Sequence, residues 1–193
     1  MPAAPRRRVS PLPAGRGWLP GVLRVPSPNC DARPAGCGVE LVVLHGIAVP
    51  PGDFDPAGVA ALFANRPPLP ALRGLRVSAH FLIDRAGGVV QFVSCARRAW
   101  HAGESSWRRR PACNDYSLGI ELSGSDRRPY APAQYRALGR LLDRLTAAYP
   151  SIRAVVGHCH VAPGRKTDPG PRFDWDALYA RIGAGYDGRP ADA

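Results

Sequence analysis

Short apolar runs along the chain alternate with polar, Gly- and Pro-rich stretches, and this alternation predicts strands and helices in turn. Runs rich in Val, Ile and Leu that are bounded by turn residues are typical of buried strands. A Gly-containing turn at 84–88 has the length of a hairpin connection and joins two of these runs. The strands that we expect lie at 40–45, 77–83, 89–93, 117–122 and 153–157.

The clearest helix is predicted over residues 132–148, where apolar residues recur at helical spacing and Pro132 suits the first turn. Its apolar positions are Tyr135, Leu138, Leu141, Leu142 and Leu145. Shorter helices are expected at 55–64 and ending near 182, whereas 95–115 is expected to be a polar loop. The fold class is therefore α/β, a single domain with a central mixed β-sheet flanked by helices.

The two ends of the chain differ in composition from the middle. Residues 1–16 contain Arg6 to Arg8 and several Pro and Gly but no apolar stretch of the export-signal kind, which predicts a flexible basic leader. Residues 183–193 are rich in Gly, Ala, Asp and Pro and predict a flexible tail. We therefore expect residues 17–182 to form a single domain, as the chain length of 193 residues suggests.

The formal net charge of +11 favours anionic partners. Of the 26 basic residues only Lys166 is a lysine, so the charge reflects a general bias towards Arg and is weak evidence of function. A nucleic-acid-binding protein is a distant alternative, because the predicted helix 132–148 carries an ordinary mixture of Arg and apolar residues. No apolar window is long enough to predict a membrane span.

The five cysteines are odd in number and contain no C-x-x-C pair. A structural zinc ribbon therefore lacks its usual ligand spacing, and a disulfide scaffold suits a chain this apolar poorly. Reduced thiols in a cytoplasmic protein are the simplest interpretation.

Candidate metal-ligating residues lie at the ends of two predicted strands. His45 closes the strand at 40–45, His158 follows the strand at 153–157, and Asp168 comes ten residues later. Two histidines and a carboxylate with an open fourth position form a catalytic zinc set. The alternative from spacing alone is that each histidine is a hydrogen-bonded structural residue.

Two further residues support the catalytic interpretation. Glu121 is the one acidic residue in an apolar strand, where a carboxylate costs free energy unless it is paired or functional. A glutamate beside a zinc site can act as general base, and the alternative is a salt bridge to an arginine. Lys166, two residues before Asp168, can approach an oxyanion as a point charge, and the alternative is chance placement on a solvated loop.

Several segments together resemble the zinc-dependent N-acetylmuramoyl-L-alanine amidases, specifically those that cleave 1,6-anhydro-muropeptides in peptidoglycan recycling. The resemblance runs from about residue 17 to residue 178. It is carried by residues 41–45, 50–54, 76–80, 98–103, 113–122 and 157–170, of which the last reads Gly-His-Cys-His-Val-Ala-Pro-Gly-Arg-Lys-Thr-Asp-Pro-Gly. The resemblance implies the fold of the amidases and peptidoglycan-recognition proteins.

The resemblance also implies roles for individual residues. The family's zinc ligands fall on His45, His158 and Asp168, its catalytic glutamate on Glu121, and its transition-state-stabilising lysine on Lys166. Positions that line the substrate cleft fall on Arg76, Trp100, His101 and Asn114. The implied cofactor is Zn²⁺ and the implied partner is an anhydro-muropeptide, with no nucleic acid, membrane insertion or obligate protein partner. Related phage amidases use Cys as third ligand, so with Asp168 present Cys159 is expected to be a packed thiol.

The chain departs from the family pattern at three places. Gly46 replaces the usual Asn, His160 replaces an Asn or Asp and offers a decoy ligand, and the stretch between 62 and 76 is short. Separately, Arg108 to Arg110 could meet the carboxylates of a stem peptide. A noncatalytic module of the same fold that binds peptidoglycan fragments stays open as the alternative function.

Overall fold

A mixed sheet of six strands forms the centre of the computed structural model, which describes residues 17–49, 55–67 and 69–183. The strand order is β1-β5-β4-β9-β3-β10. The strands are β1 Leu23–Arg24, β3 Leu41–Ile47, β4 Phe81–Ile83, β5 Val89–Gln91, β9 Ser117–Ser123 and β10 Ala154–Gly157. Within this six-stranded sheet, β4 and β5 pair antiparallel and the other neighbouring strands run parallel, which confirms the expected mixed sheet.

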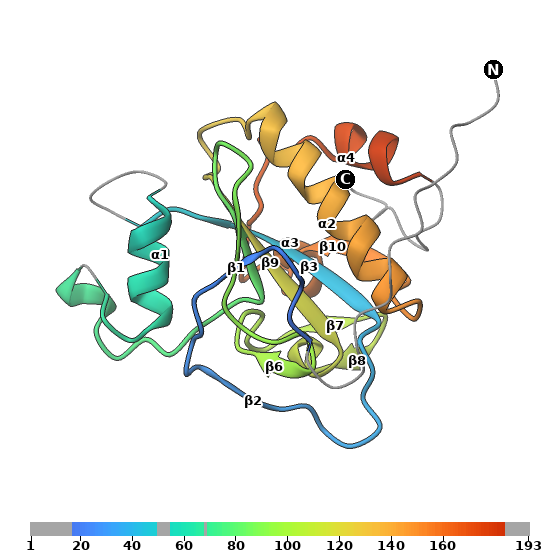
Figure 1. Ribbon diagram of the computed structural model, residues 1–193, viewed down its shortest axis with the longest axis horizontal. Coiled ribbons are helices and arrows are strands. Elements are labelled where there is room, and N and C mark those ends of the chain that lie inside the picture. The colour runs from blue at the N-terminus through green and yellow to red at the C-terminus, as the bar shows by residue number, and fades with distance from the viewer. Residues whose placement is uncertain (1–16, 50–54, 68, 184–193) are drawn as a thin grey trace.

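Four α-helices of the described residues accompany the sheet, with α2 and α4 side by side on one face and α1 on another side of the molecule (Figure 1). They are α1 Pro56–Phe63, α2 Pro132–Ala148, α3 His158–Val161 and α4 Trp175–Ile182. Asp55 and Asp174 cap α1 and α4 by accepting the backbone N–H groups of Ala57 and Ala177. The helix predicted over 132–148 has these bounds in the structure, and its five predicted apolar positions are all buried.

Alternation along β3 assigns its side chains to two separate cores. Val42 and Leu44 pack in the cluster formed with α2 and α4, whereas Leu41 and Val43 belong to a cluster on the opposite face. Successive side chains of a strand point to opposite faces. His45 therefore shares the face of Leu41 and Val43, away from α2 and α4.

The segment 95–115 differs from the predicted loop because it contains three short strands. These are β6 Arg97–Ala99, β7 Ser106–Trp107 and β8 Arg110–Pro111, and β6 pairs with β2 Cys30–Ala32. The Arg98 guanidinium holds this region together by binding Asp31 and Asp115, each at 2.6 Å. Such cross-links between distant residues have no signature in local periodicity.

Other element boundaries shifted slightly from the prediction. The strand expected at 77–83 covers only Phe81–Ile83, because the N–H of Ser78 bonds the Trp100 carbonyl instead of a strand of the large sheet. β3 runs two residues beyond the predicted end at His45, to Ile47. The predicted leader at 1–16 and nearly all of the predicted tail lie outside the described residues. No described helix is long and apolar enough to span a membrane.

Candidate metal centre

The parallel strands β3, β9 and β10 bring polar residues to one edge of the sheet. His45 on β3 is in register with Glu121 on β9, and paired positions of parallel strands face the same side. His158 follows β10 directly as the first residue of α3, and Asp168 lies on the loop after α3. Residues far apart in sequence therefore meet where these strands end.

The side chains of His45, His158 and Asp168 converge on one point. The Nδ1 atoms of His45 and His158 are 3.0 Å apart, and each of them lies 3.1 Å from Asp168 Oδ2. Ligand atoms that bind a tetrahedral zinc at roughly 2.0–2.2 Å lie about 3.3 Å from one another. The three donors are of the kind that zinc prefers and are close to this spacing, so they fit a zinc ion.

The protonation states of these residues also suit a metal. Burial is the main reason that the pKa of His45 is lowered, to about 4, which keeps its ring neutral near neutral pH. Burial alone would raise the pKa of Asp168, but hydrogen bonds with His158 and His45 hold it below its usual range. A neutral imidazole and an ionised carboxylate are the forms that bind metal.

Glu121 is a buried carboxylate beside this cluster. It is 8% exposed, and its Oε2 has no hydrogen-bond partner within the described part of the chain. Burial, followed by the charge of Asp168, raises its pKa well above the ordinary value, while Lys166 acts in the opposite direction. No arginine among the described residues forms an ion pair with Glu121, so the salt-bridge alternative is wrong for this structure. Its Oε2 atom is therefore shielded from solvent and has no partner in the described part of the chain.

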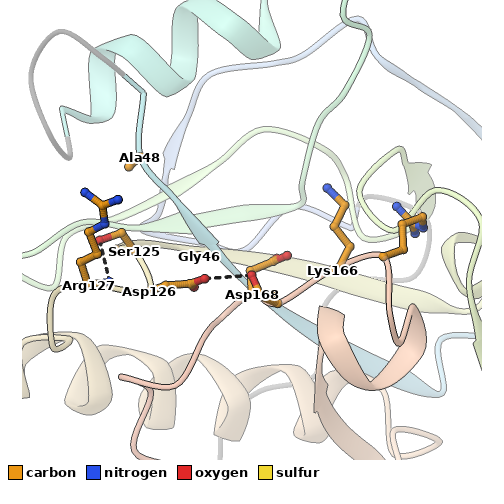
Figure 2. A pocket seen from close by; sticks show the side chains of 10 residues that line it. Gly46, Ala48, Ser125, Asp126, Arg127, Lys166 and Asp168 are labelled. Carbon is orange, nitrogen blue, oxygen red and sulfur yellow. Dashed lines mark hydrogen bonds between the residues drawn. The ribbon is translucent and has the colours of Figure 1, made fainter.

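A cavity of about 470 Å³ opens beside Asp168 (Figure 2). Asp168 lies between Asp126 on one side and Lys166 on the other. Asp126 accepts a hydrogen bond from the Thr167 hydroxyl, which fixes the loop next to Asp168. The lining residues are Gly46, Ala48, Gly124, Ser125, Asp126, Arg127, Arg165, Lys166, Thr167 and Asp168. Three cations on this wall suit an acidic ligand.

The four residues predicted to line the substrate cleft are not on the described wall of this cavity. Arg76 is exposed, with its guanidinium near the Leu75 carbonyl, and the Trp100 side chain lies close enough to Asp31 to lower the pKa of that carboxyl. His101 is buried, and the Asn114 amide oxygen bonds to backbone N–H groups. Their contacts with substrate stay predictions.

Two departures from the family pattern have structural explanations. A side chain at position 46 would place its Cβ 2.3 Å from the hydroxyl oxygen of Tyr130, which donates a hydrogen bond to the Pro169 carbonyl. Gly46 therefore leaves room for a tyrosine that fixes the residue after Asp168. His160 Nδ1 accepts the backbone N–H of Gly157, so this nitrogen is used at the start of α3. Cys159 is partly buried, which raises the pKa of its thiol.

Arg108 and Arg110 lie around a second cavity of about 300 Å³ that has no lining residue in common with the first. Arg110 pairs with Glu40 at 2.9 Å and lies 3.9 Å from the centre of the Tyr116 ring. The hypothesis that this stretch meets stem-peptide carboxylates therefore has no support from the position of Arg110.

Sequence reasoning missed three residues around the site. Tyr130 and Arg127 have no signal in their own neighbourhood, because only the folded chain brings them beside Asp168. Arg165, which donates to the carbonyls of Ala102 and Glu104, stands next to Lys166 and could have been singled out by that position.

The comparisons with known proteins agree with this geometry. The family model described as N-acetylmuramoyl-L-alanine amidase matches residues 35–171. Among solved structures, the chain is similar to the crystal structure of a Se-Met AmpD derivative, with a TM-score of 0.83 and 45% identity over 89% of this chain and 100% of that chain. The chain therefore belongs to the N-acetylmuramoyl-L-alanine amidase family, an enzyme family.

Within the family, the chain is similar to proteins named 1,6-anhydro-N-acetylmuramyl-L-alanine amidase AmpD. The protein from Citrobacter freundii is 48% identical over 173 residues, which cover 86% of this chain and 92% of that protein. The Escherichia coli K12 protein is 47% identical over 167 residues, which cover 83% and 91%. A structure of AmiD from E. coli with the substrate anhydro-N-acetylmuramic acid-L-Ala-D-gamma-Glu-L-Lys has a TM-score of 0.59 and 30% identity, covering 74% of this chain and 57% of that chain.

Proposed function

We propose that this protein hydrolyses the amide between 1,6-anhydro-N-acetylmuramic acid and the L-alanine of a stem peptide, with a zinc ion held by His45, His158 and Asp168. The observation that carries the proposal is the convergence of these three ligand atoms beside the unpartnered Glu121 Oε2. The substrate is suggested by the printed names of the similar AmpD proteins.

The reaction adds water across the amide bond. A zinc ion in this ligand set would polarise a water molecule and the scissile carbonyl. Glu121 takes a proton from the attacking water as the new C–O bond forms, then gives it to the nitrogen as the C–N bond breaks. Burial raises the pKa of Glu121, which makes its carboxylate a stronger base for the first step.

The cations of the cavity wall have separate tasks. The Lys166 ammonium compensates the negative charge that develops on the carbonyl oxygen, a contribution on the order of 3–4 kcal/mol for one well-placed donor. Arg127 and Arg165 are placed to meet the carboxylates of the peptide. Arg76, Trp100, His101 and Asn114 are the further substrate contacts that the family resemblance implies.

We further propose that residues 17–182 form the catalytic unit and that the reaction takes place in the cytoplasm. The family match at 35–171 lies inside these bounds. Five cysteines described as free thiols agree with a reducing compartment. Cell fractionation tests the location.

The rival function is a noncatalytic module that binds peptidoglycan fragments. Such a module would keep the three ligand atoms and bind metal but would not cleave the amide. It would leave the buried, unpartnered Glu121 carboxylate without a role. The nucleic-acid alternative has only the net charge in its favour.

Mass spectrometry of the products from an anhydro-muropeptide, with and without a chelator, tests reaction class and bond position together. The proposal expects free anhydro-N-acetylmuramic acid and an intact peptide that begins with L-alanine, and no products with the chelator. Zinc binding with an uncut substrate would establish the binding module instead.

A further inference from the structure

Both histidines of the metal centre have a second ring nitrogen, and in both cases that nitrogen faces the same two-residue segment. His45 Nε2 lies 3.0 Å from His101 Nδ1, and His158 Nε2 lies 3.0 Å from the carbonyl oxygen of Ala102. Adjacent residues of one loop therefore contact both ligands from behind. We infer that the dipeptide His101–Ala102 orients the two zinc histidines, and that Asn114 holds the dipeptide in place.

The direction of the first hydrogen bond follows from chemistry alone. A carbonyl oxygen accepts and never donates, so the proton of His158 is on Nε2, where it is donated to Ala102. The Nδ1 lone pair of His158 is then free and points at Asp168 and His45. A neutral imidazole has one lone pair to offer, and this contact directs it to the metal position.

The direction of the hydrogen bond between His45 and His101 follows from the need for a free lone pair on His45 Nδ1. His45 can present the Nδ1 lone pair only if its proton is on Nε2, and that proton is then donated to His101 Nδ1. His101 in turn donates from Nε2 to the hydroxyl of the fully buried Ser117, 3.2 Å away. His101 is thus a positioning residue that acts through His45, and the Ser117 hydroxyl accepts the proton that His101 carries on Nε2 in this tautomer.

Three contacts fix the dipeptide itself. The Asn114 amide oxygen accepts the backbone N–H of His101 at 3.2 Å and that of Ala102 at 2.9 Å. The His101 ring lies against the backbone of β9 at Gly119, where a Cβ would be 2.5 Å from the ring. Arg165 donates to the Ala102 carbonyl at 2.6 Å, which ties the dipeptide to the loop of Lys166 and Asp168. One side-chain amide therefore supports the partners of both zinc ligands.

This inference rests on the proposed zinc binding and changes the expected roles of His101 and Asn114. A residue that lines the substrate cleft contributes to KM, whereas a residue behind the ligands contributes to metal affinity. Outer partners of metal ligands typically change affinity or activity by about 10–100-fold when removed. The two roles therefore differ in a quantity that can be measured without substrate.

The test is zinc affinity by competition with a chromophoric chelator, in wild type, His101→Leu and His101→Asn. The Asn amide oxygen occupies nearly the position of the lost Nδ1 and can still accept from His45, whereas Leu cannot. We expect about 10–100-fold weaker zinc binding in His101→Leu and affinity close to wild type in His101→Asn. Asn114→Leu should also weaken zinc binding, because both N–H bonds to the dipeptide are lost.

His80→Asn is the matched control, because His80 is also a buried histidine and its ring contacts that of His101, but it makes no hydrogen bond to His45, His158 or Asp168. Its Nδ1 accepts the Gly119 N–H, a contact that Asn can replace, so its zinc affinity should equal wild type. Ring ¹⁵N NMR shifts of the zinc-loaded wild type should place the His45 proton on Nε2. Circular dichroism melts of each metal-free variant confirm that it is folded.

The outcomes separate the two proposals. If wild type binds no zinc, the proposed function fails. If wild type binds zinc and His101→Leu binds it equally well, or if the His45 proton is found on Nδ1, the positioning role is overturned. A higher KM with unchanged zinc affinity would return His101 to the substrate cleft.

Discussion

The charged side chains at the two ends of the parallel strands β3 and β10 are paired differently. At their C-terminal ends, His45, His158 and Asp168 converge beside a carboxylate that has no partner among the described residues. At their N-terminal ends, near Leu41 and Ala154, a second cavity is lined by arginines, of which Arg110 is neutralised by Glu40. Charge alone therefore does not identify the end where we propose the active site, whereas the buried and unpartnered Glu121 Oε2 lies at that end.

The largest effect should come from Glu121→Gln, which keeps the size of the side chain but removes the base. We expect kcat to fall by about 10²–10⁴-fold, the usual contribution of a general acid–base group, with zinc binding retained. Steady-state kinetics and metal analysis of the same sample check this. Asp168→Ala is the contrasting variant and should lose zinc itself. Wild-type kcat/KM in Glu121→Gln would remove the proposed base.

Lys166→Met should lower kcat by about 10²–10³-fold, because the stem is kept while the charge opposite the oxyanion is lost. Zinc affinity should stay near wild type, since Lys166 is not a ligand. Lys166→Arg is the control for charge, and we expect an intermediate rate because the planar guanidinium cannot act as a compact point charge. An equal kcat in all three proteins would show that Lys166 lies on the wall without taking part.

Gly46→Asn, which restores the usual family residue, should destabilise this protein. The new Cβ would lie 2.3 Å from the Tyr130 hydroxyl oxygen, and forcing extra atoms into a packed site costs about 1–3 kcal/mol. Chemical denaturation measures the loss. Tyr130→Phe in the same protein should recover part of it by removing the clashing oxygen. A Gly46→Asn variant as stable as wild type would show that Tyr130 moves freely.

The smallest effect is expected at the opposite end of the sheet. Arg110→Ala breaks an ion pair whose side chains are 43% and 44% exposed, and such pairs contribute about 0–1 kcal/mol. We expect KM for the muropeptide to stay within measurement error, also for a charge reversal of Arg108 to Arg110. A clear rise in KM would place the substrate at both ends of the sheet and end the contrast between them.

Much of this contrast could be predicted from the sequence. Continuous apolar runs predicted β3, β9 and β10, and helical spacing predicted α2, because local pattern and burial agree there. The metal set could be proposed from the strand-end positions of His45 and His158 and from the family resemblance.

The remaining parts depend on contacts between residues far apart in the chain. Arg98 joins Asp31 to Asp115 and orders a segment whose own pattern predicts a loop. Tyr130, which lies just before α2, covers Gly46, and the Asn114 side chain accepts the backbone N–H of His101. These contacts follow from the tertiary fold, and no periodicity announces them.

The most direct test of the account is a zinc titration of metal-free protein with an anhydro-muropeptide as substrate. Amide hydrolysis should rise with added zinc and level off at one equivalent, and Glu121→Gln should bind the same equivalent without turnover. Full hydrolysis by the metal-free protein would contradict a catalytic zinc centre built on His45, His158 and Asp168. Hydrolysis that still saturates at one equivalent of zinc in Asp168→Ala would contradict it as well.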